Sequence, residues 1–247
     1  MCHAGADAMN RVPTGVFGVV TLKKTERTVI EKITINNLLP EVFREEKNEP
    51  RIVNSDIWLR HVAFEKPLSY LVFAESGTGK SSLCAFLYGN RRDYEGTILF
   101  DGNDVRGFST EKWSQLRRMS LAYLPQQLSL FPEITALDNV LLKNRLTDYY
   151  SEADIRRMFE QLSIDHRADV VAGRLSIGQQ QRVAIIRALA QPFDFLLLDE
   201  PVSHLDARNN DTVAQMITSH ADSRHASVIA TSVGNHLSID SNKILRL

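Results

Sequence analysis

The chain has 247 residues, enough to bury the core of one domain or of one domain with an attached subdomain. Its 29 Lys and Arg residues balance 30 Asp and Glu residues, so the net charge is −1 and no overall basic field favours a nucleic-acid partner. Two cysteines, Cys2 and Cys84, cannot form a disulfide framework, and we expect Cys84 to be a small buried residue. Since no apolar run approaches about 18 residues and no signal peptide is visible, we expect a soluble intracellular protein.

The first part of the chain predicts strands. Residues 1–28 show little pattern, and we expect an N-terminal extension of unassigned role before a domain at 29–247. Alternating or apolar runs predict three strands before the first strong motif, at 30–35, 57–64 and 68–73. The polar stretch 44–55 predicts an exposed loop between the first two strands.

The middle and the end of the chain predict helices alternating with buried strands. A strand at 96–100 is closed by an Asp-Gly turn, a helix follows at 111–119, and Pro125 ends a strand at 121–124. Apolar residues then recur at helical spacing, which predicts a helical segment of about 127–174 inserted into the domain. Apolar strands are predicted at 193–198, 228–231 and 244–247. The all-apolar strand 193–198 is typical of a parallel sheet that is covered on both faces.

Residues 74–82 carry the strongest single motif, a small-residue turn between the strand 68–73 and a helix. Backbone N–H groups of such a turn point inward and the helix N-terminus adds partial positive charge, so a polyphosphate is the natural ligand. We predict nucleotide contacts from the whole stretch: Ala74, Glu75, Ser76, Gly77, Thr78, Gly79, Lys80, Ser81 and Ser82. Lys80 is expected to reach the β- and γ-phosphates, and the Ser81 hydroxyl to hold Mg²⁺. Ala74 stands where the usual pattern opens with Gly.

Five stretches, in this order along the chain, resemble the motifs of the ATP-binding cassette family. Residues 74–81 resemble the Walker A loop, Gln126 the Q-loop glutamine, and 175–179 the signature motif with Ile177 replacing one Gly. Residues 195–200 resemble Walker B with its catalytic glutamate, and 203–206 resemble the D-loop. The resemblance covers about residues 30–247. It implies an α/β P-loop NTPase fold with a mostly parallel core sheet, an antiparallel β subdomain and an inserted α-helical subdomain.

The resemblance also implies roles at a catalytic site for ATP and Mg²⁺. Asp199 follows a buried strand, where ligands of open α/β sheets bind, and with Ser81 and Gln126 it would hold Mg²⁺. Glu200 would orient the attacking water, and Lys80 would bind the phosphates. Phe43 is the candidate for stacking on adenine. Trp58 and Tyr70 are the competing candidates for that role. For all three aromatic residues, packing in the core is the alternative.

A second set of residues is implied to act on the nucleotide of another subunit. Ser176 is a natural N-cap, and the helix that it starts would present its N-terminus to a γ-phosphate. In the family's head-to-tail dimer this contact is made across the interface. We expect four residues to contribute to it: Ser176, Gly178, Gln179 and Asp206.

One position departs from the family pattern. Ser232 stands where a His normally contacts the γ-phosphate, and a serine cannot become cationic at neutral pH. We therefore predict a weakened but not abolished turnover, with Ser232 in the catalytic group. His236, four residues on, is interpreted as a surface residue.

Residues 130–140 and 179–185 resemble the short cassettes of the lipoprotein-releasing and macrolide-exporter group. We expect an ATPase subunit, peripheral on the cytoplasmic side of a membrane, which dimerises on ATP binding and powers a separate permease for export or lipoprotein release. An importer subunit and a degenerate regulatory cassette with weak turnover are the alternatives. A cassette ATPase acting on DNA or ribosomes is disfavoured, because the gap between Gln126 and Leu175 is short and holds no cysteine cluster, so we expect no nucleic-acid partner.

Overall fold

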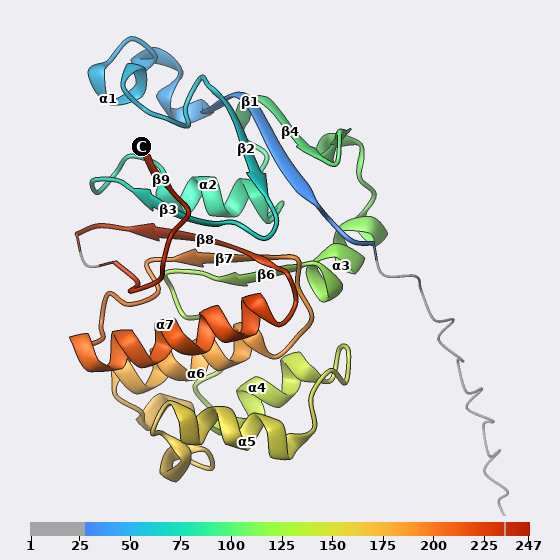
Figure 1. The fold of residues 1–247 in the computed structure, drawn as a ribbon, viewed down its shortest axis with the longest axis vertical. Coiled ribbons are helices and arrows are strands. Elements are labelled where there is room, and N and C mark those ends of the chain that lie inside the picture. The colour runs from blue at the N-terminus through green and yellow to red at the C-terminus, as the bar shows by residue number, and fades with distance from the viewer. Residues whose placement is uncertain (1–27, 235) are drawn as a thin grey trace, which may run out of the picture.

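The computed structural model describes residues 28–247 except residue 235, and the expected N-terminal extension lies outside these residues almost entirely. The described chain is built in layers (Figure 1): an antiparallel sheet, a mostly buried helix, a parallel sheet, and a set of helices on the far side of that sheet. This arrangement confirms the predicted fold class, an α/β domain with a parallel core sheet and a separate antiparallel sheet.

The core sheet has five strands in the order β6-β7-β8-β3-β9, and every neighbouring pair is parallel. Its strands are β3 (Ser69–Phe73), β6 (Leu121–Leu124), β7 (Phe195–Asp199), β8 (Ser227–Ser232) and β9 (Lys243–Arg246). Every residue of β7 and β8 is buried, as expected for central strands covered on both faces. Because all strands run the same way, their carboxyl ends meet at one edge, where the phosphate loop follows β3 and Asp199 ends β7.

The second sheet is antiparallel, in the order β2-β1-β4-β5. Its strands are β1 (Lys32–Pro40), β2 (His61–Glu65), β4 (Tyr94–Phe100) and β5 (Asn103–Asp104). The turn between β4 and β5 has positive φ at Asp101 (47°) and at Gly102 (81°), the conformation that an Asp-Gly pair favours. Helix α2 (Lys80–Leu87) lies between the two sheets (Figure 1), and its apolar side chains share one hydrophobic core with both.

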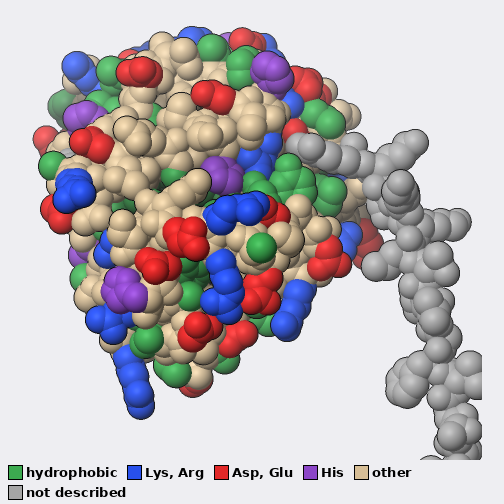
Figure 2. All heavy atoms as spheres, turned by 60° about the horizontal axis from the view of Figure 1, so that its bottom comes forward, with side chains coloured by type: hydrophobic (Ala, Val, Ile, Leu, Met, Phe, Trp, Pro, Cys, Tyr) green, Lys and Arg blue, Asp and Glu red, His purple; other side chains and the backbone are tan. Residues whose placement is uncertain are grey.

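Helices cover the other face of the core sheet. Helices α6 (Ile177–Leu189) and α7 (Ala207–Asp222) pack under it, and α4 (Ala136–Asn144) and α5 (Glu152–Gln161) lie beyond them (Figure 1). Helix α3 (Thr110–Met119) precedes β6. Five helices begin with a side chain that caps a backbone N–H three residues on: Ser109, Thr135, Ser151, Ser176 and Asp206. At the helical end of the molecule, Figure 2 shows acidic and basic side chains interspersed, without a field of one sign.

Two predicted elements differ in the structure. Residues 44–55 are not simply an exposed loop: a 3₁₀-helix η1 (Glu41–Glu46) leads into α1 (Pro50–Val53), and Phe43 and Ile52 are buried. The predicted strand 57–64 is a strand only from His61, because Ile57 and Trp58 lie in a buried turn. The rings of Phe43 and Trp58 lie close to Gly79 of the phosphate loop, a tertiary contact that local polarity does not reveal.

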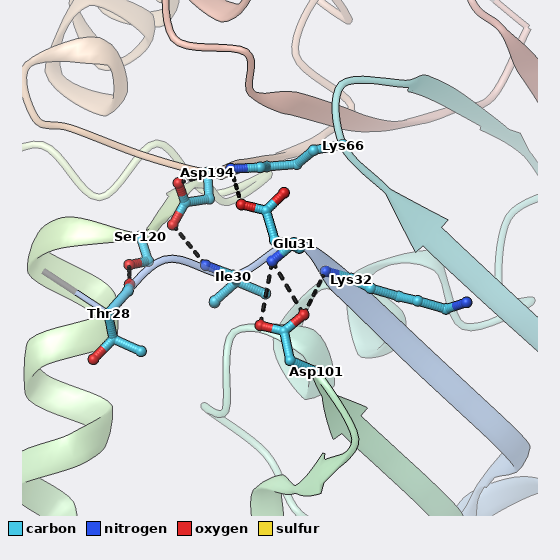
Figure 3. A network of polar contacts seen from close by, with 8 residues as sticks. All are labelled: Thr28, Ile30, Glu31, Lys32, Lys66, Asp101, Ser120 and Asp194. Atoms are coloured by element: carbon cyan, nitrogen blue, oxygen red, sulfur yellow. Dashed lines mark hydrogen bonds and ion pairs between the residues drawn. The ribbon is translucent and has the colours of Figure 1, made fainter.

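A polar network joins the start of β1 to the core sheet (Figure 3). Asp194, 1% exposed, accepts a hydrogen bond from the N–H of Ile30 (3.0 Å) and pairs with the ammonium of Lys66 (3.3 Å). Lys66 also pairs with Glu31 at 3.2 Å, and Asp101 accepts the N–H of Glu31 at 3.1 Å. These contacts compensate the buried carboxylate and link the antiparallel sheet to the strand that ends in Asp199.

Among the described residues, no helix combines the length and the apolar character needed to cross a membrane.

Candidate nucleotide-binding site

The loop between β3 and α2 has the backbone conformation that a phosphate cradle needs. Gly77 and Gly79 have φ values of 82° and 98°, a region that favours glycine. Ala74 has no such positive φ, and its N–H donates to the carbonyl of Ser232 at 3.1 Å. A Cβ is therefore tolerated at the position where the usual pattern has Gly.

A cavity of about 360 Å³ opens on this loop and collects residues from four distant parts of the chain. Its lining residues are Val42, Phe43, Ser76, Gly77, Gly79, Lys80, Ser81, Ser82, Gln126 and Glu200. Most of the predicted nucleotide contacts thus meet here. Three predicted contacts, Ala74, Glu75 and Thr78, line a different cavity of about 580 Å³ on another side of the loop.

Lys80 is held in the loop by a set of oxygen atoms. Its ammonium donates to the carbonyls of Glu75 (2.8 Å) and Ala74 (3.3 Å) and lies 3.6 Å from a carboxylate oxygen of Glu200. The side chain is only 6% exposed. A buried cation at the start of a helix, in a glycine-lined cavity, is a strong attractor for a phosphate anion.

Glu200 is positioned by contacts on both its backbone and its side chain. Its φ is 51°, which is uncommon for a residue other than Gly, and its N–H donates to the Thr231 hydroxyl at 3.2 Å. That hydroxyl in turn donates to Asp199 at 2.9 Å, while the Gln126 amide donates to the Glu200 carboxylate at 3.4 Å. Thr231 thus organises both acidic residues.

The oxygen donors near the loop fit Mg²⁺. The buried carboxylate of Asp199 and the hydroxyl of Ser81 are hard ligands, and Mg²⁺ characteristically takes one or two carboxylates and fills its shell with water and phosphate. In the described part of the chain, no group of three or more His, Cys, Asp or Glu residues could bind a metal alone.

Burial, with a smaller effect of the Asp199 charge, raises the pKa of the Cys84 thiol well above its usual value, so Cys84 stays neutral.

The predicted adenine contact is partly covered. Phe43 lines the cavity but is 7% exposed, and the Arg51 guanidinium lies 5.1 Å from the centre of its ring. The competing candidates Trp58 and Tyr70 are fully buried and do not line this cavity. Ser232, at 1% exposure, is also absent from the lining.

Three of the four predicted in-trans residues, Ser176, Gly178 and Gln179, lie at the N-terminus of α6, whereas Asp206 caps α7. Ser176 and Gln179 make a reciprocal capping box, with hydrogen bonds of 3.3 and 3.0 Å. At Gly178 a Cβ would lie 3.1 Å from the carbonyl of His204, so the D-loop backbone packs against this glycine. None of the four residues, Asp206 included, lines the cavity at the phosphate loop.

Sequence reasoning missed two residues that shape the site. Gln181 is buried; its amide donates to the Pro201 carbonyl at 2.6 Å and accepts the His204 N–H at 3.1 Å, so α6 holds the segment that follows Glu200. The sequence predicts Thr231 only as part of the core strand 228–231. The available signal was its hydroxyl, one residue before the end of β8 and in register with Asp199.

Together, the parallel sheet, the glycine-rich loop after β3 and the carboxylates at the end of β7 define a P-loop nucleotide-binding protein. The family model described as "ABC transporter" matches residues 64–203, more than half of the sequence. The chain belongs to the ABC transporter family.

Two similar proteins carry the name "Lipoprotein-releasing system ATP-binding protein LolD". The one from Shewanella frigidimarina is 34% identical over 149 residues, which cover 59% of this chain and 62% of the relative. The one from Francisella tularensis subsp. tularensis is 30% identical over 176 residues, which cover 70% of this chain and 76% of the relative. The matched segment therefore spans a little under two thirds of the first relative's length.

Solved structures agree with this fold. The dimeric structure of MJ0796, described as a bacterial ABC transporter cassette, has a TM-score of 0.65 at 22% identity and covers 81% of this chain and 87% of that one. A bacterial Atm1-family ABC exporter with ATP bound has a TM-score of 0.70 at 25% identity, covering 88% of this chain and 37% of that one.

Proposed function

We propose that this chain is the ATP-binding and ATP-hydrolysing subunit of an ABC transporter, and that it powers a separate permease in export or lipoprotein release. The observation that carries the proposal is the meeting of Lys80, Gln126 and Glu200, far apart in the sequence, at one glycine-lined cavity. The likeness to the two LolD proteins supports the cargo class.

In the proposed reaction each side chain has one task. Lys80 exchanges its carbonyl partners for the β- and γ-phosphates, and Glu200, released from Lys80, orients the attacking water. Ser81, Gln126 and Asp199 would hold Mg²⁺, which neutralises charge on the phosphates when it is bound. The Thr231 hydroxyl keeps the backbone of Glu200 and the carboxylate of Asp199 in fixed relation.

A second copy of the chain is the proposed partner for the N-terminus of α6. Ser176 is exposed there and does not line the phosphate-loop cavity of its own chain, so the N-terminus of α6 would be available to an anion held by another subunit. The exposed Ile177, 50% accessible, would add apolar contact to the same interface. Two such subunits in a head-to-tail arrangement would each complete the site of the other.

The proposed contact with the permease lies in a groove of about 290 Å³ beside α4 and α6. Phe131 and Leu146 at its edge are 56% and 51% exposed. Inside it, burial and then the neighbouring Arg187 charge lower the pKa of Lys143 to about 8. A permease segment with apolar and acidic side chains would cover this surface, and would place the chain at the cytoplasmic face of the membrane.

Turnover of Mg-ATP by the full chain tests the proposal. We expect phosphate release that depends on Glu200 and on Mg²⁺. Ser232 and Ala74 depart from the family pattern and favour a second candidate function, a regulatory cassette that binds ATP but barely hydrolyses it. Nucleotide binding without turnover above the Glu200→Gln level would select that second function, and absence of nucleotide binding would exclude both.

A further inference from the structure

We propose that Trp58 is a positioning residue of the phosphate loop: its indole N–H orients the Thr78–Gly79 peptide so that the Gly79 N–H faces the bound phosphates. The inference rests on the proposed nucleotide site. Trp58 touches no cavity in which a nucleotide would bind, so its action is indirect.

The geometry of one peptide unit carries the argument. The fully buried Trp58 donates from Nε1 to the Thr78 carbonyl at 2.9 Å. In a trans peptide the C=O and the following N–H point in opposite directions. A carbonyl held towards the protein interior therefore turns the N–H of Gly79 towards the cavity side, where Gly79 and Lys80 are lining residues.

The space around Gly79 constrains the same part of the phosphate loop. Gly79 has a φ of 98°, and a Cβ there would come within 2.9 Å of the Trp58 ring and 3.1 Å of the Phe43 ring. The two rings thus form a floor under Gly79 that admits only glycine. Thr78 is fixed a second time by its hydroxyl, which donates to the Glu75 carbonyl at 2.8 Å.

Trp58 is itself held firmly. The Ser55 hydroxyl oxygen accepts the N–H groups of Ile57 (3.0 Å) and Trp58 (2.9 Å). The adjacent Asp56 exchanges hydrogen bonds with the backbone of Arg246 in β9, both at 2.8 Å. These hydrogen bonds fix the turn at 55–58 to the core sheet. The hydrogen bond from the Trp58 indole then restricts the movement of the phosphate loop.

The test compares Trp58→Phe with Trp113→Phe in the full chain. Both replace a buried tryptophan by phenylalanine, but the Trp113 N–H has no hydrogen-bond partner, and that ring packs against Gly89, away from the phosphate loop. We expect W58F to weaken binding of Mg-ATP and Mg-ADP about tenfold, because the Thr78 carbonyl loses its donor. KM should rise by a similar factor while kcat changes little, since the loop holds phosphates in ground and transition states alike.

Fluorescence gives a second readout. The chain has two tryptophans, so W113F leaves Trp58 as the single reporter, and its emission should change when Mg-ADP binds. Equal nucleotide affinity in W58F and W113F, or a lower melting temperature of W58F with unchanged Kd and KM, would overturn the role of Trp58 but not the proposed function. If the wild type and W113F bind no nucleotide, the proposed function fails and this inference falls with it.

Discussion

Glu200 shows how one residue can be set by several weak constraints. A positive φ of 51° is maintained because the backbone N–H bonds to Thr231 and the next peptide groups are held by Gln181. The carboxylate lies between the Lys80 ammonium and the Gln126 amide. A residue with an uncommon backbone conformation, whose carboxylate faces a cation and an amide, is suited to a catalytic task.

Replacing this carboxylate by an amide is expected to remove hydrolysis and spare binding. We expect Glu200→Gln to lower kcat for Mg-ATP at least about 100-fold, because the amide is a poor proton acceptor, while the ATP Kd changes little. Phosphate release and equilibrium binding measure the two quantities. Glu160→Gln, on the exposed face of α5, is the matched control. Equal turnover in E200Q and E160Q would exclude Glu200 as the catalytic residue.

Substitution of Ser232 provides a second test at the scale of single residues. We expect Ser232→His to raise kcat several-fold, because an imidazole can reach further towards the γ-phosphate and can carry positive charge. Ser232→Ala controls for loss of the hydroxyl and should not exceed the wild-type rate. An S232H rate equal to or below the wild-type rate would contradict the prediction.

Among the elements, the helical insertion is tied to α7 by an aromatic and basic cluster. The Tyr150 hydroxyl, just before α5, contacts the His220 Nδ1 at 3.0 Å and accepts a short hydrogen bond from Arg224. Burial, and then the Arg224 charge, lower the pKa of His220 to about 4 from its ordinary 6.5. The cluster therefore requires a neutral imidazole.

The stability of this contact should depend on pH. Between pH 6.5 and pH 4 the unfolded chain binds a proton at His220 that the folded chain excludes, so the free energy of unfolding decreases as pH falls. The loss should reach up to about 2 kcal/mol at pH 5. Denaturant unfolding of His220→Gln, which cannot titrate, should lack this component. His166→Gln, at an exposed site, is the control and should keep the wild-type dependence. An identical pH dependence in H220Q would refute the assignment.

At the scale of the whole molecule, none of the residues expected to contact a nucleotide in trans lines the phosphate-loop cavity of its own chain. The phosphate loop lies at the carboxyl edge of the core sheet, whereas the capping box of Ser176 starts α6 apart from that cavity. The helix N-terminus would need a nucleotide from another subunit, so association should depend on ATP.

We expect Glu200→Gln to form a dimer at saturating Mg-ATP, because hydrolysis can no longer reopen the interface. Light scattering should show the mass rise from 27.9 kDa to about twice that value. Adding Ser176→Arg should prevent the dimer without loss of ATP binding, since a bulky side chain would block the tip of α6. An E200Q protein that stays monomeric while it binds ATP would count against the head-to-tail arrangement.

The sequence predicted the elements that depend on short-range pattern. The glycine loop, the Asp-Gly turn and the apolar strand before Asp199 all appear where expected, because backbone conformation and burial on both faces leave local signatures. The loop predicted at 44–55 is mostly exposed but contains part of η1 and all of α1, and the strand predicted at 57–64 begins only at His61. Local composition does not reveal that the rings of Phe43 and Trp58 lie close to Gly79.

The sequence by itself determined the family, the parallel sheet and the order of the phosphate-binding and acidic motifs, because each of these depends on a pattern of residues that are close together in the chain. Only the tertiary structure decided what supports those motifs: the Trp58 hydrogen bond spans 20 positions, the Thr231 hydroxyl reaches Asp199 across 32, and Gln181 reaches Pro201 across 20. Such contacts depend on how distant elements pack, and no local pattern specifies that packing.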